Sequence, residues 1–352
     1  MKRMMALLLA MLMAMSLVAC GGQTDQTSGG ADDGQKVYTL RLNTNMSEND
    51  KTNSAFGVAL TNFAAECEEK SGGRLKIDIY MNSQLGKSAD ELINGSQSGA
   101  FEMFNLVAAN WGSYTNAFTP VNIPYLFTDE EVLQKFLEGE QGDALKAQVL
   151  QDTQCHICYY GYLGFRQIVN NKHAISSPSD LNGLKMRVLS DKYTVAAFEA
   201  MGASPTNVSY NELYTASQQG LIDGSDGPYA NILNCNLQDV QKYLTESRNA
   251  YTLGVMVINQ DAYDKLPDDL KAVFDEACAN AEQTARGNAE YEEAALKELE
   301  ASMEVTHLTN AQMQEFKDAM APVWTMAEND LGSDKWSAIT SEIQRIETEL
   351  GK

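Results

Sequence analysis

Histidine is scarce in this sequence, whose 352 residues include only three. A zinc site needs several nitrogen or sulfur ligands close together, and so few imidazoles leave little material for one. Neither a G-x-S-x-G nor an H-E-x-x-H pattern occurs, so common serine-hydrolase and zinc-protease motifs are missing. The acidic segment DGSDG at 223–227 fails as an EF-hand loop because glycine takes its fifth position. We therefore predict no metal site and no cofactor.

Positive charge is also in short supply, with 26 lysines and arginines against 48 acidic residues and a net charge of −22. Phosphate binding needs clustered basic residues, so nucleic acid is excluded as a partner. If the protein binds an anion, the positive charge must be local. One arginine, Arg187, stands in the apolar stretch GLKMRV at 183–188. Burying its charge is costly without a negative partner, either inside or outside the chain.

Long apolar runs are confined to the N-terminus. The run at 4–18 follows a basic start, is too short for a comfortable membrane span, and predicts a signal peptide at 1–19. The letters LVAC at 17–20 resemble a bacterial lipobox, which implies lipid attachment to Cys20 after cleavage. The alternative is an ordinary signal peptide with an incidental cysteine. Residues 20–36 are predicted to be a flexible tether, so we expect an extracytoplasmic, membrane-anchored lipoprotein at the cell surface or in the periplasm.

The cysteines beyond this leader are odd in number, so at least one thiol is free or pairs outside the chain. Two of them form the CxxC pattern CHIC at 155–158. A redox motif of this type usually opens a helix, whereas this one lies in an apolar, aromatic run that predicts a strand. We favour buried structural thiols over a redox or metal site. The five cysteines are Cys67, Cys155, Cys158, Cys235 and Cys278.

Strand and helix patterns alternate along the chain. Residues 37–45 and 74–81 alternate as strands do, and 53–73 between them has helical spacing, which indicates parallel βαβ units. The length favours two lobes. A later helical pattern continues from about 269 to about 302, which corresponds to a helix about 50 Å long. Such a helix would tie the two lobes together, with a possible break at 286–287.

Six stretches in order, between about residue 38 and 300, resemble the solute-binding proteins of TRAP (tripartite ATP-independent periplasmic) transporters, the DctP-like family. They read FAAECEEKSGGRLKIDIYMNSQLG, NIPYLF, GFRQIVNN, ISSPSDLNGLKMRV, MGASPTNVSYNELYTASQQGLIDGSDGP and DAYDKLPDDLKAVFDEA. The resemblance implies an α/β, two-lobe periplasmic-binding-protein-like fold, type II-like, with a long helix spanning both lobes and a ligand cleft between them. We expect lobe 1 at 37–163 plus about 253–291, and lobe 2 at 164–252 plus about 292–352.

The resemblance also assigns roles to two arginines. Arg187, in KMRV, is expected to form the main salt bridge to a substrate carboxylate, and Arg166, in GFRQ, to assist nearby. A planar guanidinium offers two parallel N–H donors that match a carboxylate. Both would need a partner when the lobes close, which makes closure depend on ligand. The alternative is that both pair with internal acids such as Asp226 or Asp223.

Four further positions carry weaker expectations. Asn45 matches a polar contact in some family members, and Tyr210 matches a position where an aromatic lines the cleft, although it could equally belong to the core. Where many members read D-G-x-E-N-P, this chain has Asp226 and Gly227. Losing the asparagine removes a donor and adds room, so we expect a solute that differs from the usual C4-dicarboxylates and sialic acid. Asp226 would accept hydrogen bonds from solute hydroxyls or cap the turn.

The function that the resemblance implies is that of an extracytoplasmic solute receptor of a TRAP transporter. It would bind a C4-dicarboxylate, a sugar acid or a similar carboxylate, close its lobes, and deliver the solute to the membrane permease. It would act as a monomer and not as an enzyme. One alternative is a solute-binding lipoprotein of another transporter or sensor system. An extracytoplasmic enzyme is a weaker alternative, because the sequence shows no recognisable nucleophile, metal cluster or cofactor loop.

Overall fold

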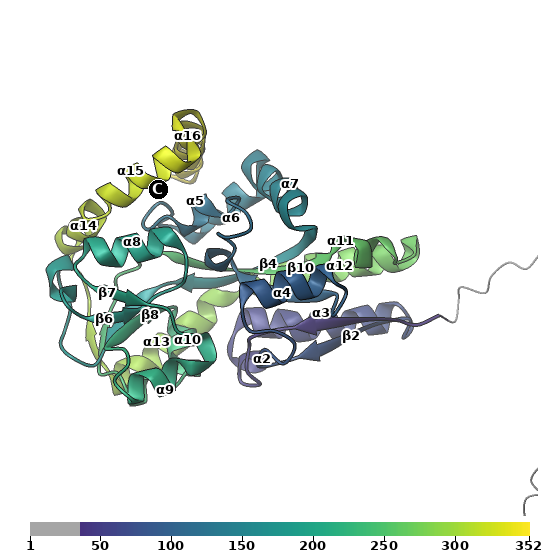
Figure 1. Ribbon diagram of the computed structural model, residues 1–352, viewed down its shortest axis with the longest axis horizontal. Helices are drawn as coiled ribbons and strands as arrows, with labels where there is room; N and C mark the ends of the chain where they lie inside the picture. Colours follow the sequence, from purple (N-terminus) through teal and green to yellow (C-terminus); the bar gives the residue numbers. More distant parts are fainter. Residues whose placement is uncertain (1–35) are drawn as a thin grey trace, which may run out of the picture. The chain divides into compact units, whose positions relative to one another are not determined.

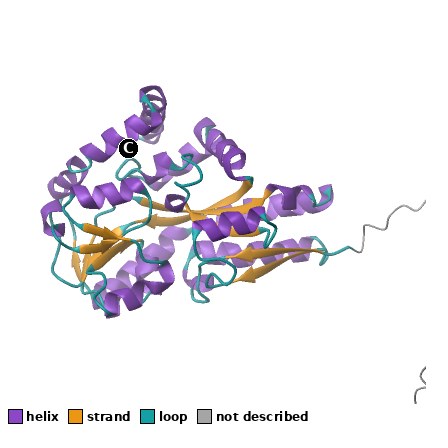
Figure 2. Ribbon diagram, in the orientation of Figure 1, coloured by secondary structure: helices purple, strands orange, loops and turns teal. Residues whose placement is uncertain are grey.

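The computed structural model describes residues 36–352. The predicted signal peptide, Cys20 and almost all of the tether lie outside these residues. Within the described part, no helix combines the length and the apolar character needed to cross a membrane. Figure 1 and Figure 2 show two groups of strands, each flanked by helices.

The first sheet has five strands in the order β2-β1-β3-β10-β4. β1 runs parallel to β2 and β3, and β10 runs antiparallel to β3 and β4, so the predicted parallel βαβ start of the chain is confirmed. The interior strand β10 is buried along its whole length, as expected for its largely apolar sequence. The strands are β1 (Tyr38–Asn43), β2 (Leu75–Tyr80), β3 (Met103–Val107), β4 (Cys155–Phe165) and β10 (Tyr251–Asn259).

Helix α3 covers this sheet, and its limits follow from local sequence. Ser54 caps its first turn by accepting a hydrogen bond from the amide of Gly57. The ring of Phe56 lies against Gly161 and Gly254, which pair across β4 and β10, where a Cβ atom would stand within 2.6 Å of the ring. The helices of this part are α2 (Asp50–Asn53), α3 (Ala55–Lys70), α4 (Ala89–Gln97), η1 (Ala108–Asn110), α5 (Thr119–Asn122), α6 (Glu130–Glu138), α7 (Glu140–Thr153), α11 (Gln260–Asp264) and α12 (Asp268–Ala285).

The second sheet has six short strands in the order β11-β9-β5-β8-β6-β7. The sequence analysis allowed Asp226 to cap a turn, but Gly224–Gly227 is a buried strand, β8, between β5 and β6. Glycine suits this place because a Cβ on Gly224 would lie 2.3 Å from the carbonyl oxygen of Val169. The other strands are β5 (Gln167–Asn170), β6 (Lys185–Arg187), β7 (Ser204–Thr206), β9 (Tyr243–Thr245) and β11 (Glu304–Thr306).

Helices also surround the second sheet. They are η2 (Pro178–Leu181), α8 (Lys192–Ala200), η3 (Tyr210–Glu212), α9 (Leu213–Gln218), α10 (Tyr229–Asn234), η4 (Leu237–Asp239), α13 (Asn288–Ser302), α14 (Asn310–Asp318) and α15 (Ala321–Leu331). The side-chain carboxylate of Glu292, on α13, accepts hydrogen bonds from the backbone amides of Tyr229 and Ala230 at 3.0 and 2.9 Å. It therefore caps the start of α10.

The predicted long helix is present but interrupted. It breaks at Arg286–Gly287, the place where the sequence left a break open, into α12 and α13. α12 packs on α3 and β4 beside the first sheet, and α13 packs on α10 beside the second. The pair therefore ties both parts of the fold together.

The last helix, α16 (Ser333–Leu350), which the sequence analysis assigned to lobe 2, packs beside the first sheet. Its buried side chains Ile339, Ile343 and Ile346 belong to the hydrophobic core of the first sheet, and it packs on α6. The apolar side chains of α14 and α15, in contrast, join a core on the second sheet. The amphipathic pattern of α16 indicates a packed face but carries no information on which sheet receives it.

The chain crosses between the sheets at two neighbouring points. β4 ends and β5 begins on either side of Arg166, and the return passes from β9 to β10 through Asn249 and Ala250. The two crossing segments bind each other, since the amide of Arg166 donates to the carbonyl of Ala250 at 2.8 Å and that of Asn249 to the carbonyl of Arg166 at 3.2 Å. Arg166 is thus held at the crossing by its own backbone.

Candidate functional site

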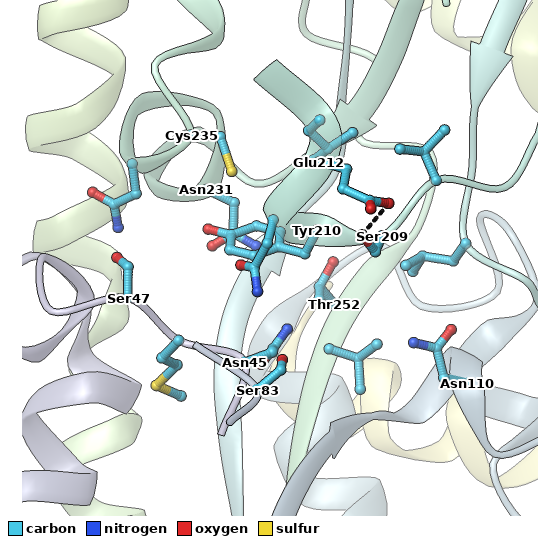
Figure 3. A pocket seen from close by; sticks show the side chains of 18 of the residues that line it. Asn45, Ser47, Ser83, Asn110, Ser209, Tyr210, Glu212, Asn231, Cys235 and Thr252 are labelled. Carbon is cyan, nitrogen blue, oxygen red and sulfur yellow. Dashed lines mark hydrogen bonds between the residues drawn. The ribbon is translucent and has the colours of Figure 1, made fainter. Parts of the chain in front are cut away.

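A cavity of about 780 Å³ lies where the two sheets meet. Its size falls within the roughly 300–1,000 Å³ typical of small-molecule sites. The first sheet contributes Asn105 and Thr252 to its wall, and the second contributes Arg187 and Asp226. Figure 3 shows polar side chains gathered from both sides, among them Asn45 and Ser83 opposite Tyr210 and Asn231.

Arg187 is the buried cation of this cavity that lacks an acidic partner. It ends the short strand β6 and is 7% exposed. Its Nε donates to the carbonyl of Val208 at 2.9 Å, but no acid among residues 36–352 forms an ion pair with it. Burial, together with the nearby charge of Arg166, lowers the pKa of Arg187 to about 10. The two terminal nitrogens of the guanidinium therefore remain available for a negative group from outside.

Arg166 also lines the cavity, but it has an internal acid. Its Nε and Nη2 donate to the two carboxylate oxygens of Asp226 at 2.7 and 2.6 Å, and its Nη1 donates to Thr252 Oγ1 at 3.0 Å. Asn249 Nδ2 donates to the same carboxylate at 3.0 Å. This is the internal pairing that the sequence left open as an alternative, and it applies to only one of the two arginines. A direct contact of Arg166 with a solute stays a prediction.

Asp226 is ionised in this setting. Burial acts to raise its pKa, but the charge of Arg166 and the hydrogen bonds from Arg166 and Asn249 outweigh it, so the pKa lies below its ordinary value. Asp226 is thus the internal partner of Arg166, as one of the alternatives in the sequence analysis allowed. It still lines the cavity, where contact with solute hydroxyls stays a prediction.

The remaining predicted residues also lie at the cavity. Asn45 accepts a hydrogen bond from Asn105 Nδ2 at 3.3 Å. Tyr210, in η3, is half-buried, and burial raises its pKa well above the ordinary value. A Cβ on Gly227 would meet only Ile232 and Asn231, at 3.9 and 4.0 Å, so the space beside this glycine is open. The structure therefore brings all six predicted residues to one cavity.

Several cavity residues escaped the sequence analysis. Asn105 is a polar residue inside the apolar strand β3, and this contrast in the sequence could have pointed to it. Its Oδ1 is buried without a hydrogen-bond partner among the described residues. Asp50 is 4% exposed, and its carboxylate accepts bonds from Ser47 and Asn234. A buried acid at the start of a short polar helix has no distinctive sequence pattern.

The thiols do not form a reactive site in the described part of the chain. All five described cysteines are unpaired, and no group of three or more potential ligands there is placed to hold a metal ion. Burial raises the pKa of Cys155 to about 11 and that of Cys67 to about 12, which disfavours the reactive thiolate. Cys235 lines the cavity, and burial raises its pKa to about 11 as well.

Comparison with known proteins agrees with this geometry. Residues 46–330 match the family model DctP, described as bacterial extracellular solute-binding protein, family 7. The chain belongs to this family. The predicted membership of the DctP-like family is therefore confirmed. The predicted α/β two-lobe fold, which the solved relatives share, is confirmed as well.

Among curated family 7 relatives, the C4-dicarboxylate-binding periplasmic protein DctP of Rhodobacter capsulatus is 29% identical over 287 residues, 80% of this chain and 85% of the relative. The sugar acid binding protein DctPAm of Advenella mimigardefordensis, solved with galactonate, is 27% identical with a TM-score of 0.82, over 88% of this chain and 99% of the other. A TRAP periplasmic solute binding protein of a Polaromonas species, bound to D-erythronate, is 29% identical with a TM-score of 0.78, over 86% and 98%.

Proposed function

We propose that this protein is the extracytoplasmic solute receptor of a TRAP transporter, and that it binds an organic acid anion through Arg187. The observation that carries the proposal is the buried guanidinium of Arg187, which faces a cavity without an internal acid among the described residues. A carboxylate accepts two parallel N–H bonds from such a fork, and the pair gains strength in a closed, water-poor cavity. The relatives that bind galactonate and D-erythronate support the same ligand class.

The proposal includes closure of two lobes on the solute. The contents of the hydrophobic cores support a revised division, with 37–163, about 253–291 and α16 in lobe 1, and with 164–252 and about 292–331 in lobe 2. An empty, closed cavity would enclose an unpaired guanidinium, which is unfavourable. The solute would therefore favour the closed form by supplying the missing negative charge.

The proposal further places the receptor at the membrane through a lipid on Cys20, as a non-enzymatic monomer that passes its solute to the permease subunits. The lipobox LVAC and the extracellular family support this location. Radioactive palmitate incorporation in cells, compared with a Cys20→Ser variant, would test the anchor. Label in the wild type that is absent from the variant supports it, and equal label contradicts it.

The binding function is tested by isothermal titration calorimetry of the purified protein against a panel of organic acids and neutral sugars. We expect carboxylates to bind, and Arg187→Met to abolish their binding. Arg187→Lys should also bind poorly, because a compact ammonium does not reproduce the two-donor fork. Arg345→Met is the control, since Arg345 is exposed and pairs with surface glutamates of α16. Normal binding by Arg187→Met, or binding of neutral sugars alone, would contradict the proposal.

A further inference from the structure

The charges that line the cavity leave room for a single carboxylate. Lys87, Arg166 and Arg187 are its basic lining residues. Arg166 is already neutralised by Asp226, through two bonds from its guanidinium to the carboxylate. Lys87 is exposed and lies two residues before the start of α4. Within residues 36–352, the cavity therefore offers one buried cation without an internal acid.

Negative charge occupies other parts of the same wall. Asp50, Glu91, Glu212 and Asp226 are the acidic lining residues, and of these Asp50 and Asp226 are buried. Hydrogen bonds from Ser47 and Asn234, which also line the cavity, hold the Asp50 carboxylate in this wall. A solute whose first carboxylate binds Arg187 would thus bring a second carboxylate into a cavity with a buried acid and no second unpaired buried cation. Like charges in a site with little water repel strongly.

Neutral amide groups supply the rest of the recognition surface. Asparagine accounts for ten of the 40 lining residues. Among the described residues, Asn105 Oδ1 is buried without a hydrogen-bond partner. The side-chain amide of Asn231 and the Nδ2 of Asn45 also form no hydrogen bond with these residues. An unpaired buried acceptor such as Asn105 Oδ1 requires a donor. A ligand hydroxyl can donate and accept, whereas a carboxylate can only accept.

We infer that the solute is a monocarboxylate carrying several hydroxyl groups, with its carboxylate on Arg187 and its hydroxyls on the asparagine amides, and that dicarboxylates of the same length are disfavoured. The inference rests on the proposed function and narrows its ligand class. The open space beside Gly227 is compatible with a chain longer than four carbons.

Four six-carbon probes separate the contributions by calorimetry: galactonate, galactarate, hexanoate and galactitol. Galactonate should bind about tenfold or more tightly than either galactarate, which adds a second carboxylate, or hexanoate, which lacks the hydroxyls. Galactitol, which lacks the carboxylate, should not bind. A second series replaces the six-carbon acids by glycerate, erythronate and succinate, so that a poor fit in length does not decide the result.

Asp50→Asn tests the source of the discrimination, and Glu48→Gln, at an exposed position two residues earlier, is its control. We expect Asp50→Asn to improve galactarate binding relative to galactonate and Glu48→Gln to leave the ratio unchanged. The inference is overturned if galactarate or succinate binds as tightly as the matching hydroxy monocarboxylate, if hexanoate matches galactonate, or if no hydroxy monocarboxylate binds. Binding of dicarboxylates that still requires Arg187 would leave the proposed function intact, whereas carboxylate binding that survives Arg187→Met would overturn both.

Discussion

Arg187→Met and Arg166→Met should change the stability of the ligand-free protein in opposite directions. Both substitutions remove a buried guanidinium from the same cavity and insert an apolar chain of similar length. Arg187 carries a charge without an internal acid, so its removal relieves a penalty. Arg166 carries a charge matched by Asp226, so its removal leaves a carboxylate that is 3% exposed without its cation.

The magnitudes follow from the two environments. Lowering the pKa of Arg187 to about 10, well below its ordinary value, corresponds to a native-state penalty of roughly 3 kcal/mol at neutral pH. The lost hydrogen bond to Val208 offsets about 1–2 kcal/mol of this. Arg187→Met should therefore raise the free energy of unfolding by roughly 1–2 kcal/mol. Breaking the buried Arg166–Asp226 pair should lower it by about 3–5 kcal/mol.

Urea denaturation followed by circular dichroism at pH 7, without ligand, measures both changes. Repeating the measurement with a saturating organic acid should stabilise the wild type and leave Arg187→Met unaffected, because ligand stabilises only a protein that binds it. Arg345→Met, which breaks exposed ion pairs, should stay within about 1 kcal/mol of the wild type. If Arg187→Met destabilises the ligand-free protein as much as Arg166→Met does, then the claim that Arg187 lacks an internal partner is wrong.

Two further substitutions test the buried carboxyl group of Glu292 and the open space beside Gly227. Burial raises the pKa of Glu292 to about 7, so the native protein binds the proton of this carboxyl group more tightly than the unfolded chain does. The contribution of Glu292 to the free energy of unfolding should therefore fall by roughly 1–3 kcal/mol as the pH rises from about 4.5 to about 7. Urea melts at pH 5 and pH 8 should show that Glu292→Gln lacks this fall while the exposed Glu293→Gln keeps it; equal pH dependence in all three proteins would refute the assignment. Gly227→Asn should fold normally, since its Cβ meets no atom closer than 3.9 Å, but should weaken binding of six-carbon acids more than of glycerate in calorimetry. Equal affinities for both lengths would argue that the space beside Gly227 is not used.

Much of the fold could be read from local patterns. The alternation at 37–45 and 74–81 and the helical spacing at 53–73 correspond to β1, β2 and α3. Strand β8 was missed because its two glycines and its aspartate are typical of a turn. The close approach of β5 explains Gly224, and the charge of Arg166 explains Asp226. The placement of α16 depends on which apolar surface remains uncovered after the rest of the chain has folded, which its own sequence does not record.

All six predicted site residues line one cavity, but the sequence left the partners of the two arginines open. Arg166 and Arg187 both read as arginines in apolar strands, and their sequence context did not distinguish them. What separates them is that β5 pairs with β8 in the register that joins Ile168 to Asp226, which brings a carboxylate from 60 residues away to Arg166. Such long-range registers are set by the whole sheet. Asn105 and Asp50 were missed because a single polar residue points to a binding site only when it is buried, and their burial is set by the folded structure.

The connections between the two parts of the fold have a mechanical consequence. Besides the crossings at Arg166 and Asn249, the chain passes from one part to the other at Gly287 and again at Gly332, where α15 gives way to α16. Several parallel links resist sliding and free twisting far more than a single swivel would. Any rotation of one part relative to the other must bend all of these connections together. A substitution that stiffens the backbone at Gly332 should therefore change the range of angles open to the two parts. Gly332 would have this effect although it is not among the cavity-lining residues.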